Sequence, residues 1–218
     1  MASEFVVIGL GRFGQAVARS LQRLGQSVMV LDADQDRVQD ASTEFDAAVC
    51  ADATDERTIH ELGLEKMAAA IVAIGETSIE SSILVTALLR QLGVPRIVGR
   101  AVTDLHARVL LEVGAHEVVN PEQHAGERLG RRLAYPSVRE QLDLGENAAL
   151  AEIEAPESFA GRTLAELEVR RRHGVTVVGL RRGGAVLANL GPEDRIDSGD
   201  VLIVVGAPDA LRRLAALS

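Results

Sequence analysis

Three glycines near the start of the chain, Gly9, Gly11 and Gly14, lie between a short apolar run and an amphipathic helical pattern. An acid, Asp32, lies eighteen positions after Gly14 and ends a second apolar run. This order of strand, glycine loop, helix, strand and acid is that of a dinucleotide-binding fingerprint. The glycines would allow a tight turn, close approach of a phosphate and close helix packing, while Asp32 would bind ribose hydroxyls and disfavour NADP. The alternative is a glycine-rich turn without a ligand.

Arg12 stands in the first turn of the predicted helix, where a cation meets the positive end of the helix dipole. This placement costs about 0.3–1 kcal/mol at an exposed site, so we expect an anion to compensate for it. Arg12 is therefore a candidate phosphate clamp, and a solvated arginine over the sheet edge is the alternative. Next to it, Phe13 starts an apolar stripe that continues at Val17 and Leu21, the spacing of one helix face.

Two further loops follow predicted strands, and the carboxyl ends of parallel strands meet at one edge of a sheet. The loop from Asp52 to Asp55 follows the third strand. Its residues are candidates for contact with adenosine, while Thr54 or Asp55 is a candidate cap for the next helix, and the two roles are compatible. Gly75 and Glu76 end the fourth strand, where we expect the backbone to approach the ligand.

The sequence lacks the other common catalytic and metal-binding patterns. Its five histidines do not have the spacing of a transition-metal site, and the single cysteine, Cys50, excludes a multi-thiolate site. It has no nucleophile elbow and no Walker P-loop. A dehydrogenase also needs a proton acceptor beside the nicotinamide, and the later part of the chain groups no His, Tyr or Lys at its predicted strand edges. These absences disfavour an enzyme.

The elements that position these residues follow from apolar runs that alternate with helical patterns. Continuous apolar runs predict strands over residues 5–8, 27–31, 47–50, 70–74, 96–102 and 116–119. Apolar spacing predicts helices between them, over residues 13–24, 34–41, 55–62, 79–92 and 104–113. Parallel neighbours need such crossover connections. The sequence therefore predicts an α/β domain with a Rossmann-like, doubly wound parallel sheet.

The alternation ends after Pro121. A helical pattern over residues 122–133 is not followed by an apolar strand pattern. The polar passage after it predicts a linker or hinge. Beyond it, a small α+β domain is predicted, with strands over 149–153, 175–180, 185–187 and 201–205 and helices over 163–172 and 208–217. The expected organisation is a nucleotide-binding domain, a linker and a second domain, over residues 1–134, 135–147 and 148–218.

Composition restricts the partners and the compartment. Lys and Arg number 23 against 32 Asp and Glu, a formal charge of −9, which disfavours nucleic acid as a partner. The single cysteine fits a reducing compartment. The longest apolar stretches, residues 68–74 and 83–89, fall short of the roughly 18 residues that span a bilayer, and the start lacks the basic segment of a signal peptide. We therefore expect a cytoplasmic protein, unless a partner holds it at a membrane.

The motifs GLGRFG, VLDAD, ADATD, IVAIG, RIVGRA and GAHEVVNPE occur in that order. In order and spacing they resemble the nucleotide-binding domain of the regulator of potassium conductance family, also called KTN or TrkA-N. The later segments GRTLAELEVRRRHGVTVVGL and PEDRIDSGDVLIVVG resemble the TrkA-C domain that follows it. One copy of each domain resembles the cytosolic regulatory subunit of a Ktr-type potassium uptake system.

This resemblance implies a function without catalysis. Such subunits form dimers that assemble into an octameric ring beneath a membrane potassium-translocating subunit, bind ATP or ADP, and gate the partner by changing ring shape. They lie at the inner face of the membrane through that partner. NAD or NADH binding is also attributed to some members, so an NAD-dependent oxidoreductase or NADH redox sensor is the rival hypothesis.

The resemblance also implies roles for individual residues. Arg12 would reach the γ-phosphate of a nucleotide on a neighbouring subunit, and Arg100 would lie near the ligand. Glu122 would help hold a divalent cation, Mg²⁺ or Ca²⁺, between two bound nucleotides. The implied ligand-binding set is Gly9, Gly11, Arg12, Phe13, Gly14, Asp32, Asp52, Ala53, Thr54, Gly75, Glu76 and Arg100. Cyclic di-AMP would bind in the TrkA-C domain at Leu164, Ala165, Arg170 and Pro192.

Overall fold

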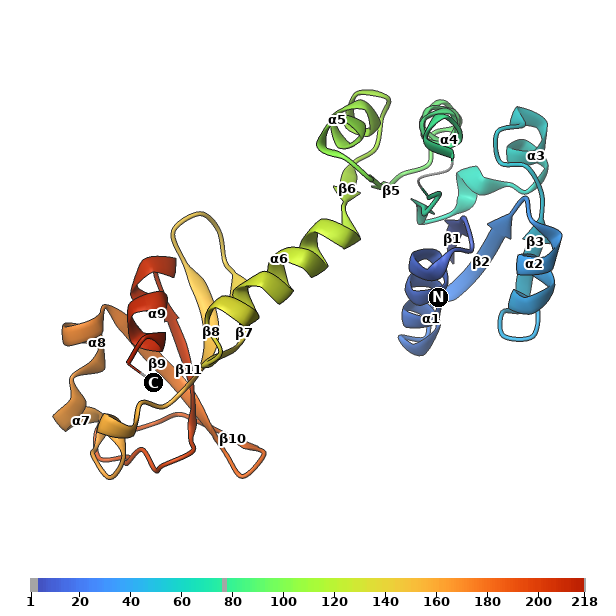
Figure 1. The fold of residues 1–218 in the computed structure, drawn as a ribbon. Helices are drawn as coiled ribbons and strands as arrows, with labels where there is room; N and C mark the ends of the chain where they lie inside the picture. The colour runs from blue at the N-terminus through green and yellow to red at the C-terminus, as the bar shows by residue number, and fades with distance from the viewer. Residues whose placement is uncertain (1–3, 76–77, 218) are drawn as a thin grey trace. The chain divides into compact units, whose positions relative to one another are not determined.

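A computed structural model describes residues 4–75 and 78–217 of the chain (Figure 1). By its internal contacts the chain divides into two compact units, residues 1–124 and residues 125–218. Glu76, which the sequence placed beside the ligand, lies outside the described residues. Every helix in the described part of the chain is too short or too polar to traverse a bilayer.

Unit 1 contains a six-stranded parallel sheet in the order β3-β2-β1-β4-β5-β6. The predicted Rossmann-like fold is therefore confirmed. The strand order reverses between β1 and β4, and ligands bind at such a switch point in open α/β sheets. The strands are β1 (Glu4–Ile8), β2 (Ser27–Asp32), β3 (Ala47–Cys50), β4 (Ala69–Val72), β5 (Ile97–Arg100) and β6 (Glu117–Val119).

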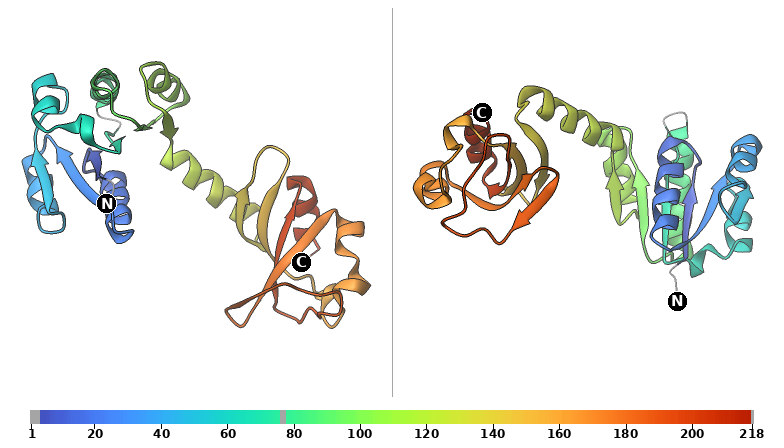
Figure 2. Two further views of the ribbon diagram at one scale, coloured as in Figure 1. Left: turned by 180° about the vertical axis from the view of Figure 1, so that it is seen from behind. Right: turned by 90° about the horizontal axis from the view of Figure 1, so that it is seen from below.

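Helices cover both faces of this sheet, as the views in Figures 1 and 2 show. One face carries α1 (Arg12–Arg23) and α2 (Gln35–Ala41), and the other carries α3 (Glu56–Glu61), α4 (Ile79–Leu92) and α5 (Asp104–Glu112). In β1, the buried Val7 packs with the first pair of helices and the buried Val6 packs with α3 and α4. Burial on both faces explains the continuous apolar runs of the strands.

Unit 2 contains a five-stranded antiparallel sheet in the order β10-β9-β11-β8-β7. Helices α8 and α9 pack on one face of it through Val169, Leu211 and Leu214. This small α+β domain is the one that the sequence predicts. Its strands are β7 (Val138–Asp143), β8 (Ala149–Glu154), β9 (Val175–Arg182), β10 (Ala185–Ala188) and β11 (Val201–Gly206). Its short helices are α7 (Leu164–Leu167), α8 (Val169–His173) and α9 (Pro208–Ala215).

The prediction of a linker over residues 135–147 is wrong for residues 138–143, which form β7. This strand pairs with β8 along the edge of the sheet, from Val138 opposite Ile153 to Asp143 opposite Ala149. In β7 only Val138 is buried, because an edge strand faces solvent on most of its surface. Its polar composition therefore looks like that of a loop. The extents of the two predicted domains stay predictions, since the compact units meet within α6 (Pro121–Ala134).

The helix predicted over residues 163–172 is broken into α7 and α8 at Glu168, which has a φ of 46°. Leu167 and Val169 are both buried in the core of unit 2. In a continuous helix, residues two positions apart point in nearly opposite directions, so both could not face one core. The left-handed conformation of Glu168 turns the chain between them and lets both side chains pack inward.

Candidate functional site

A cleft of about 290 Å³ opens at the carboxyl ends of the central strands of unit 1, at the switch point. Eight of the residues predicted to bind a ligand line it, namely Gly9, Gly11, Asp32, Asp52, Ala53, Thr54, Gly75 and Arg100. Three other members of the predicted set, Arg12, Phe13 and Gly14, do not line it. The sequence analysis missed several lining residues, among them Arg37, Ser78 and Ser81. Ligand binding by the whole set stays a prediction.

The glycine loop has the geometry that its residues require. Gly9 has a φ of 100°, and a Cβ there would lie 3.0 Å from the backbone of Ala73. A Cβ on Gly14 would lie 1.9 Å from the carbonyl oxygen of Gly9. At Gly11 a Cβ would meet no atom within 4 Å, so the backbone there faces open space. Gly11 is also the N-cap of α1 and has no side chain that could cap the helix. The first turn of α1 therefore presents backbone N–H groups without a side-chain acceptor at the cleft.

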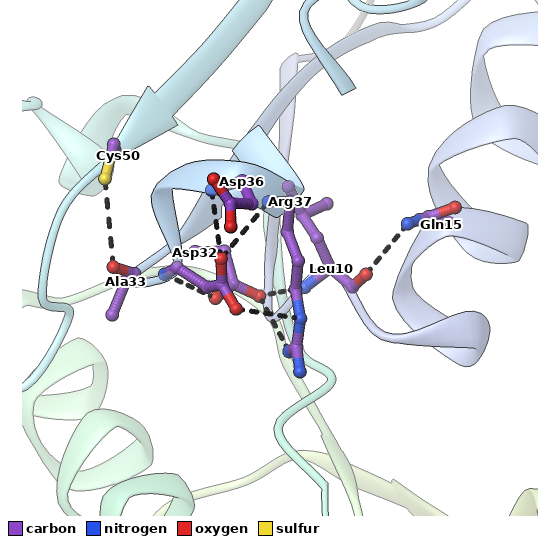
Figure 3. A network of polar contacts seen from close by, with 8 residues as sticks. Leu10, Gln15, Asp32, Ala33, Asp36, Arg37 and Cys50 are labelled. Carbon is purple, nitrogen blue, oxygen red and sulfur yellow. Dashed lines mark hydrogen bonds and ion pairs between the residues drawn. The ribbon is translucent and has the colours of Figure 1, made fainter. Parts of the chain in front are cut away.

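Asp32 holds the glycine loop in place (Figure 3). Its Oδ2 accepts a hydrogen bond of 2.6 Å from the N–H of Leu10, and its Oδ1 accepts one of 2.9 Å from the N–H of Asp34. The side chain is 10% exposed. An ionised carboxylate has about four acceptor positions, so Asp32 keeps acceptor capacity for ribose hydroxyls after making these two bonds.

Arg37 lies against this carboxylate from the first turns of α2, as Figure 3 shows. Its Nη1 is 3.5 Å from Asp32 Oδ2, and its Nε is 3.4 Å from Asp34 Oδ2. Asp34 also caps α2 by accepting from the N–H groups of Asp36 and Arg37. One sequence signal could have identified Arg37. It lies five residues after Asp32, in the first turn of the helix that follows β2.

The loop after β3 combines a helix cap with residues that face the cleft. Asp55 caps α3 by accepting a hydrogen bond from the N–H of Arg57. Asp52 Oδ1 accepts from the N–H of Thr54 at 2.9 Å and from its hydroxyl at 2.7 Å. These two bonds, the backbone one first, hold the pKa of Asp52 below its usual range. The carboxylate is therefore ionised at neutral pH and faces the cleft as an acceptor.

Arg100 closes the opposite side of the cleft at the end of β5. Its Nη2 donates to Glu122 Oε1 at 2.6 Å, and its Cζ lies 5.9 Å from the centre of the Phe13 ring. Phe13, in α1, therefore packs under the Arg100 guanidinium and against the core of unit 1, and does not line the cleft. Arg12 is exposed at the start of α1. Unit 1 therefore places Arg100, and not Arg12, in its own cleft.

Glu122 is the predicted cation ligand, and its contacts do not make a metal centre by themselves. Its carboxylate is paired with the Arg100 guanidinium. In the described part of the chain, no group of three or more His, Cys, Asp or Glu is placed to hold a metal ion. A divalent cation at Glu122 would therefore need ligands beyond the described residues, such as nucleotide phosphates.

Comparisons with known proteins match both units. The TrkA-N domain model matches residues 5–121, and the TrkA-C domain model matches residues 149–218. The chain belongs to the TrkA-N/TrkA-C family. Two similar members are potassium uptake proteins of Ktr systems. Protein C of Bacillus subtilis (strain 168) is 38% identical over 98% of this chain and 96% of its own length. Protein A of Vibrio alginolyticus is 35% identical over 95% of this chain and 94% of its own length.

Solved structures of the GsuK channel share the fold of this TrkA-N/TrkA-C chain. One matches 100% of this chain and 39% of the channel chain, with a TM-score of 0.72 and 21% identity. A structure of GsuK bound to ADP matches 62% of this chain and 34% of the channel chain, with a TM-score of 0.53 and 26% identity. The chain thus spans about two fifths of the channel chain in the first match.

In the TrkA-C domain, the residues predicted to bind cyclic di-AMP are only partly brought together. Backbone pairing joins two of them, because the N–H of Ala165 donates to the carbonyl of Pro192 at 2.9 Å. Leu164 and Arg170 line a shallow cavity of about 380 Å³ on α7, α8 and β9. Ala165 and Pro192 do not line this cavity. Cyclic di-AMP binding stays a prediction.

Proposed function

We propose that the chain is the nucleotide-sensing regulatory subunit of a membrane potassium uptake system. The observation that carries the proposal is the distribution of charge along the cleft. Asp32 and Asp52 line one part of it, with Arg37 beside Asp32, and the uncapped N-terminus of α1 and Arg100 line another. A ligand that matches has hydroxyl and amine donors at one end and phosphates at the other, as an adenine nucleotide does.

The role in potassium uptake rests on the relatives. The Bacillus subtilis and Vibrio alginolyticus relatives are named as potassium uptake proteins of Ktr systems, and the alignments cover nearly the whole of each chain. The role is regulatory and not enzymatic. The chain acts at the cytoplasmic face of the membrane by binding a potassium-translocating subunit.

ATP and ADP are the proposed ligands. The GsuK structure bound to ADP shares the fold over 62% of this chain at 26% identity, which supports an adenine nucleotide. NAD and NADH share the adenosine and the two phosphates that the fingerprint would bind, so they are the direct competitors. A sensor of NADH redox state, or an oxidoreductase, is the alternative function.

The chain is further proposed to assemble from dimers into an octameric ring. Arg12 is exposed outside the cleft of its own unit, which leaves it available to a nucleotide on a neighbouring subunit. In such a ring, a divalent cation between two nucleotides would gain the ligands that Glu122 alone does not supply. Ligand exchange would then change the shape of the ring and gate the partner.

Thermal unfolding with ATP, ADP, AMP, NAD and NADH at equal concentration tests the choice of ligand. A ligand that binds only the folded state stabilises it by about 2.7 kcal/mol when present at roughly 100 times its Kd. We expect ATP and ADP to raise the midpoint of unfolding more than NAD, NADH or AMP. Stabilisation by NADH alone, without an effect of ATP or ADP, would rule out this proposal in favour of the redox alternative.

A further inference from the structure

One ion pair connects the cleft of unit 1 with the first turn of α6. The Arg100 side chain lines the cleft and is 14% exposed, and its Nη2 donates to Glu122 Oε1 at 2.6 Å. Glu122 lies in the first turn of α6, a helix that begins in unit 1 and continues into unit 2. The residue that faces the ligand and the helix that leaves the nucleotide-binding unit are therefore in direct contact.

The Arg100 guanidinium is only partly satisfied by this contact. Its Nε is buried and has no hydrogen-bond partner among the residues that the structure describes. Leaving a buried donor of a charged group unpaired is unfavourable. The Nε–H and one N–H of Nη2 point the same way and form one side of the planar fork. Glu122 Oε1 accepts from Nη2, and Nε stays unpaired within the described part of the chain.

A phosphate has the acceptor geometry to fill the whole side of the fork. Two of its oxygens can accept from Nε and Nη2 together, which pairs the buried donor that Glu122 leaves unpaired. Both anions would then compete for Nη2, and a carboxylate beside a phosphate is repelled. The Phe13 ring, 5.9 Å from Cζ, limits movement of the guanidinium away from this place.

We propose that Arg100 exchanges Glu122 for a phosphate of the bound ligand, and that this exchange releases the first turn of α6. The proposal rests on the nucleotide-binding function proposed above. It adds a physical route by which ligand binding in the cleft affects α6. In the ligand-free state Arg100 ties α6 to β5. In the bound state the phosphate holds Arg100, and Glu122 is free to take another partner.

Glu122→Gln tests the exchange, because it removes the competing charge and keeps the size of the side chain. In titration calorimetry with ADP and ATP in EDTA buffer, we expect a Kd about threefold to tenfold lower than that of the wild type. Adenosine has no phosphate and should bind both proteins equally. Glu117→Gln is the matched control, because it breaks the Arg96–Glu117 ion pair at the other end of β5 and β6 and should leave each Kd unchanged.

The gain must also depend on Arg100. In an Arg100→Ala background, Glu122→Gln should no longer tighten ADP binding, which separates competition at the guanidinium from a general loss of negative charge. Hydrogen exchange gives an independent readout, since the amides of residues 122–126 should exchange faster in wild type with ADP and in Glu122→Gln without it.

The outcomes distinguish this proposal from the one it rests on. If wild type binds neither ADP nor ATP, the proposed nucleotide function fails. If wild type binds them but Glu122→Gln binds them equally or more weakly, only the exchange is overturned. A gain that persists in the Arg100→Ala background also overturns it.

Discussion

At the residue scale, Asp32 connects the fold of unit 1 with its cleft. Before any ligand binds, its oxygens accept from the N–H groups of Leu10 and Asp34 and so join the glycine loop to the start of α2. Asp32 also lines the cleft, where its Oδ2 lies 3.5 Å from Arg37 Nη1. If the cleft binds a nucleotide as proposed, contact with its ribose and the position of the glycine loop would be coupled through this one side chain.

Arg12 is the residue that we expect to separate ATP from ADP. The two ligands differ only in the third phosphate, and a guanidinium is suited to bidentate contact with phosphate oxygens. Arg12→Ala should therefore weaken ATP binding by about 1.5–3 kcal/mol, the value of a charged hydrogen bond, and leave ADP binding almost unchanged. Titration calorimetry of both ligands on the assembled protein measures this difference.

The control for this prediction is Arg23→Ala, at the last residue of the same helix. It removes an arginine from α1 at the end far from the glycine loop and should not change either Kd. Equal losses of ATP and ADP affinity in Arg12→Ala would contradict the prediction. Arg12 would then neutralise the phosphates that the two nucleotides share, and Arg100 would be the next candidate for the residue that distinguishes ATP from ADP.

At the scale of elements, α4 and α5 meet through a buried polar pair in an otherwise apolar contact. His106 Nε2 lies 2.8 Å from Ser82 Oγ, and Nδ1 accepts from the N–H of Val102 at 3.4 Å. Burial lowers the pKa of His106. The ring is therefore neutral in the folded protein at neutral pH, with Nε2 donating to Ser82.

This arrangement predicts acid sensitivity of the helix pair. Because the pKa of His106 is lower in the folded state, the unfolded chain binds a proton first as the pH falls below the ordinary histidine pKa. The contribution of His106 to the free energy of unfolding is therefore fully present above a pH of about 6.5 and decreases below it. By pH 5.5, one unit below the ordinary histidine pKa, the loss should be at most about 1.4 kcal/mol, because the proton binds to the unfolded chain and one pKa unit corresponds to that free energy.

Urea unfolding of wild type and His106→Gln at pH 7.5 and pH 5.5 measures this effect. The variant should be less stable at pH 7.5 and should lose less stability between the two pH values. His60→Gln, at an exposed histidine in the last turn of α3, is the control and should keep the wild-type pH dependence. An unchanged pH dependence in His106→Gln would show that other groups cause it.

At the scale of the whole molecule, α6 is the surface that we expect to take part in the proposed assembly. It has no buried residue, and its Leu129 and Leu133 are exposed, the latter by 71%. A helix with such a face is stabilised when another surface covers it. Light scattering at micromolar concentration should therefore give the mass of eight chains, and a monomer would count against the ring.

A substitution makes the assembly prediction specific to α6. Leu133→Lys places a charge on the exposed face and should shift the protein toward smaller species, because burying an unpaired charge is unfavourable. Leu24→Lys is the matched control, since Leu24 is also 71% exposed and lies at the end of α1. Equal masses for wild type and Leu133→Lys would place the interface elsewhere.

Elements with a strong local signal could be predicted from the sequence alone. Strands buried on both faces must be continuously apolar, so the runs at β1 and β4 were recognisable, and Gly93 and Pro95 identified the end of α4. The position of the cleft also followed from the sequence, because the glycine loop and Asp32 must meet where parallel strands end.

Features that depend on contacts between distant residues could not be predicted from the sequence and became visible only in the fold. The edge strand β7 is polar and becomes a strand by pairing with β8, while the break at Glu168 exists because Leu167 and Val169 face one core. Arg100 and Glu122 are 22 positions apart, and no local pattern joins them. Their pairing follows from the neighbouring carboxyl ends of β5 and β6, because hydrogen bonds form between groups that the sheet brings together in space.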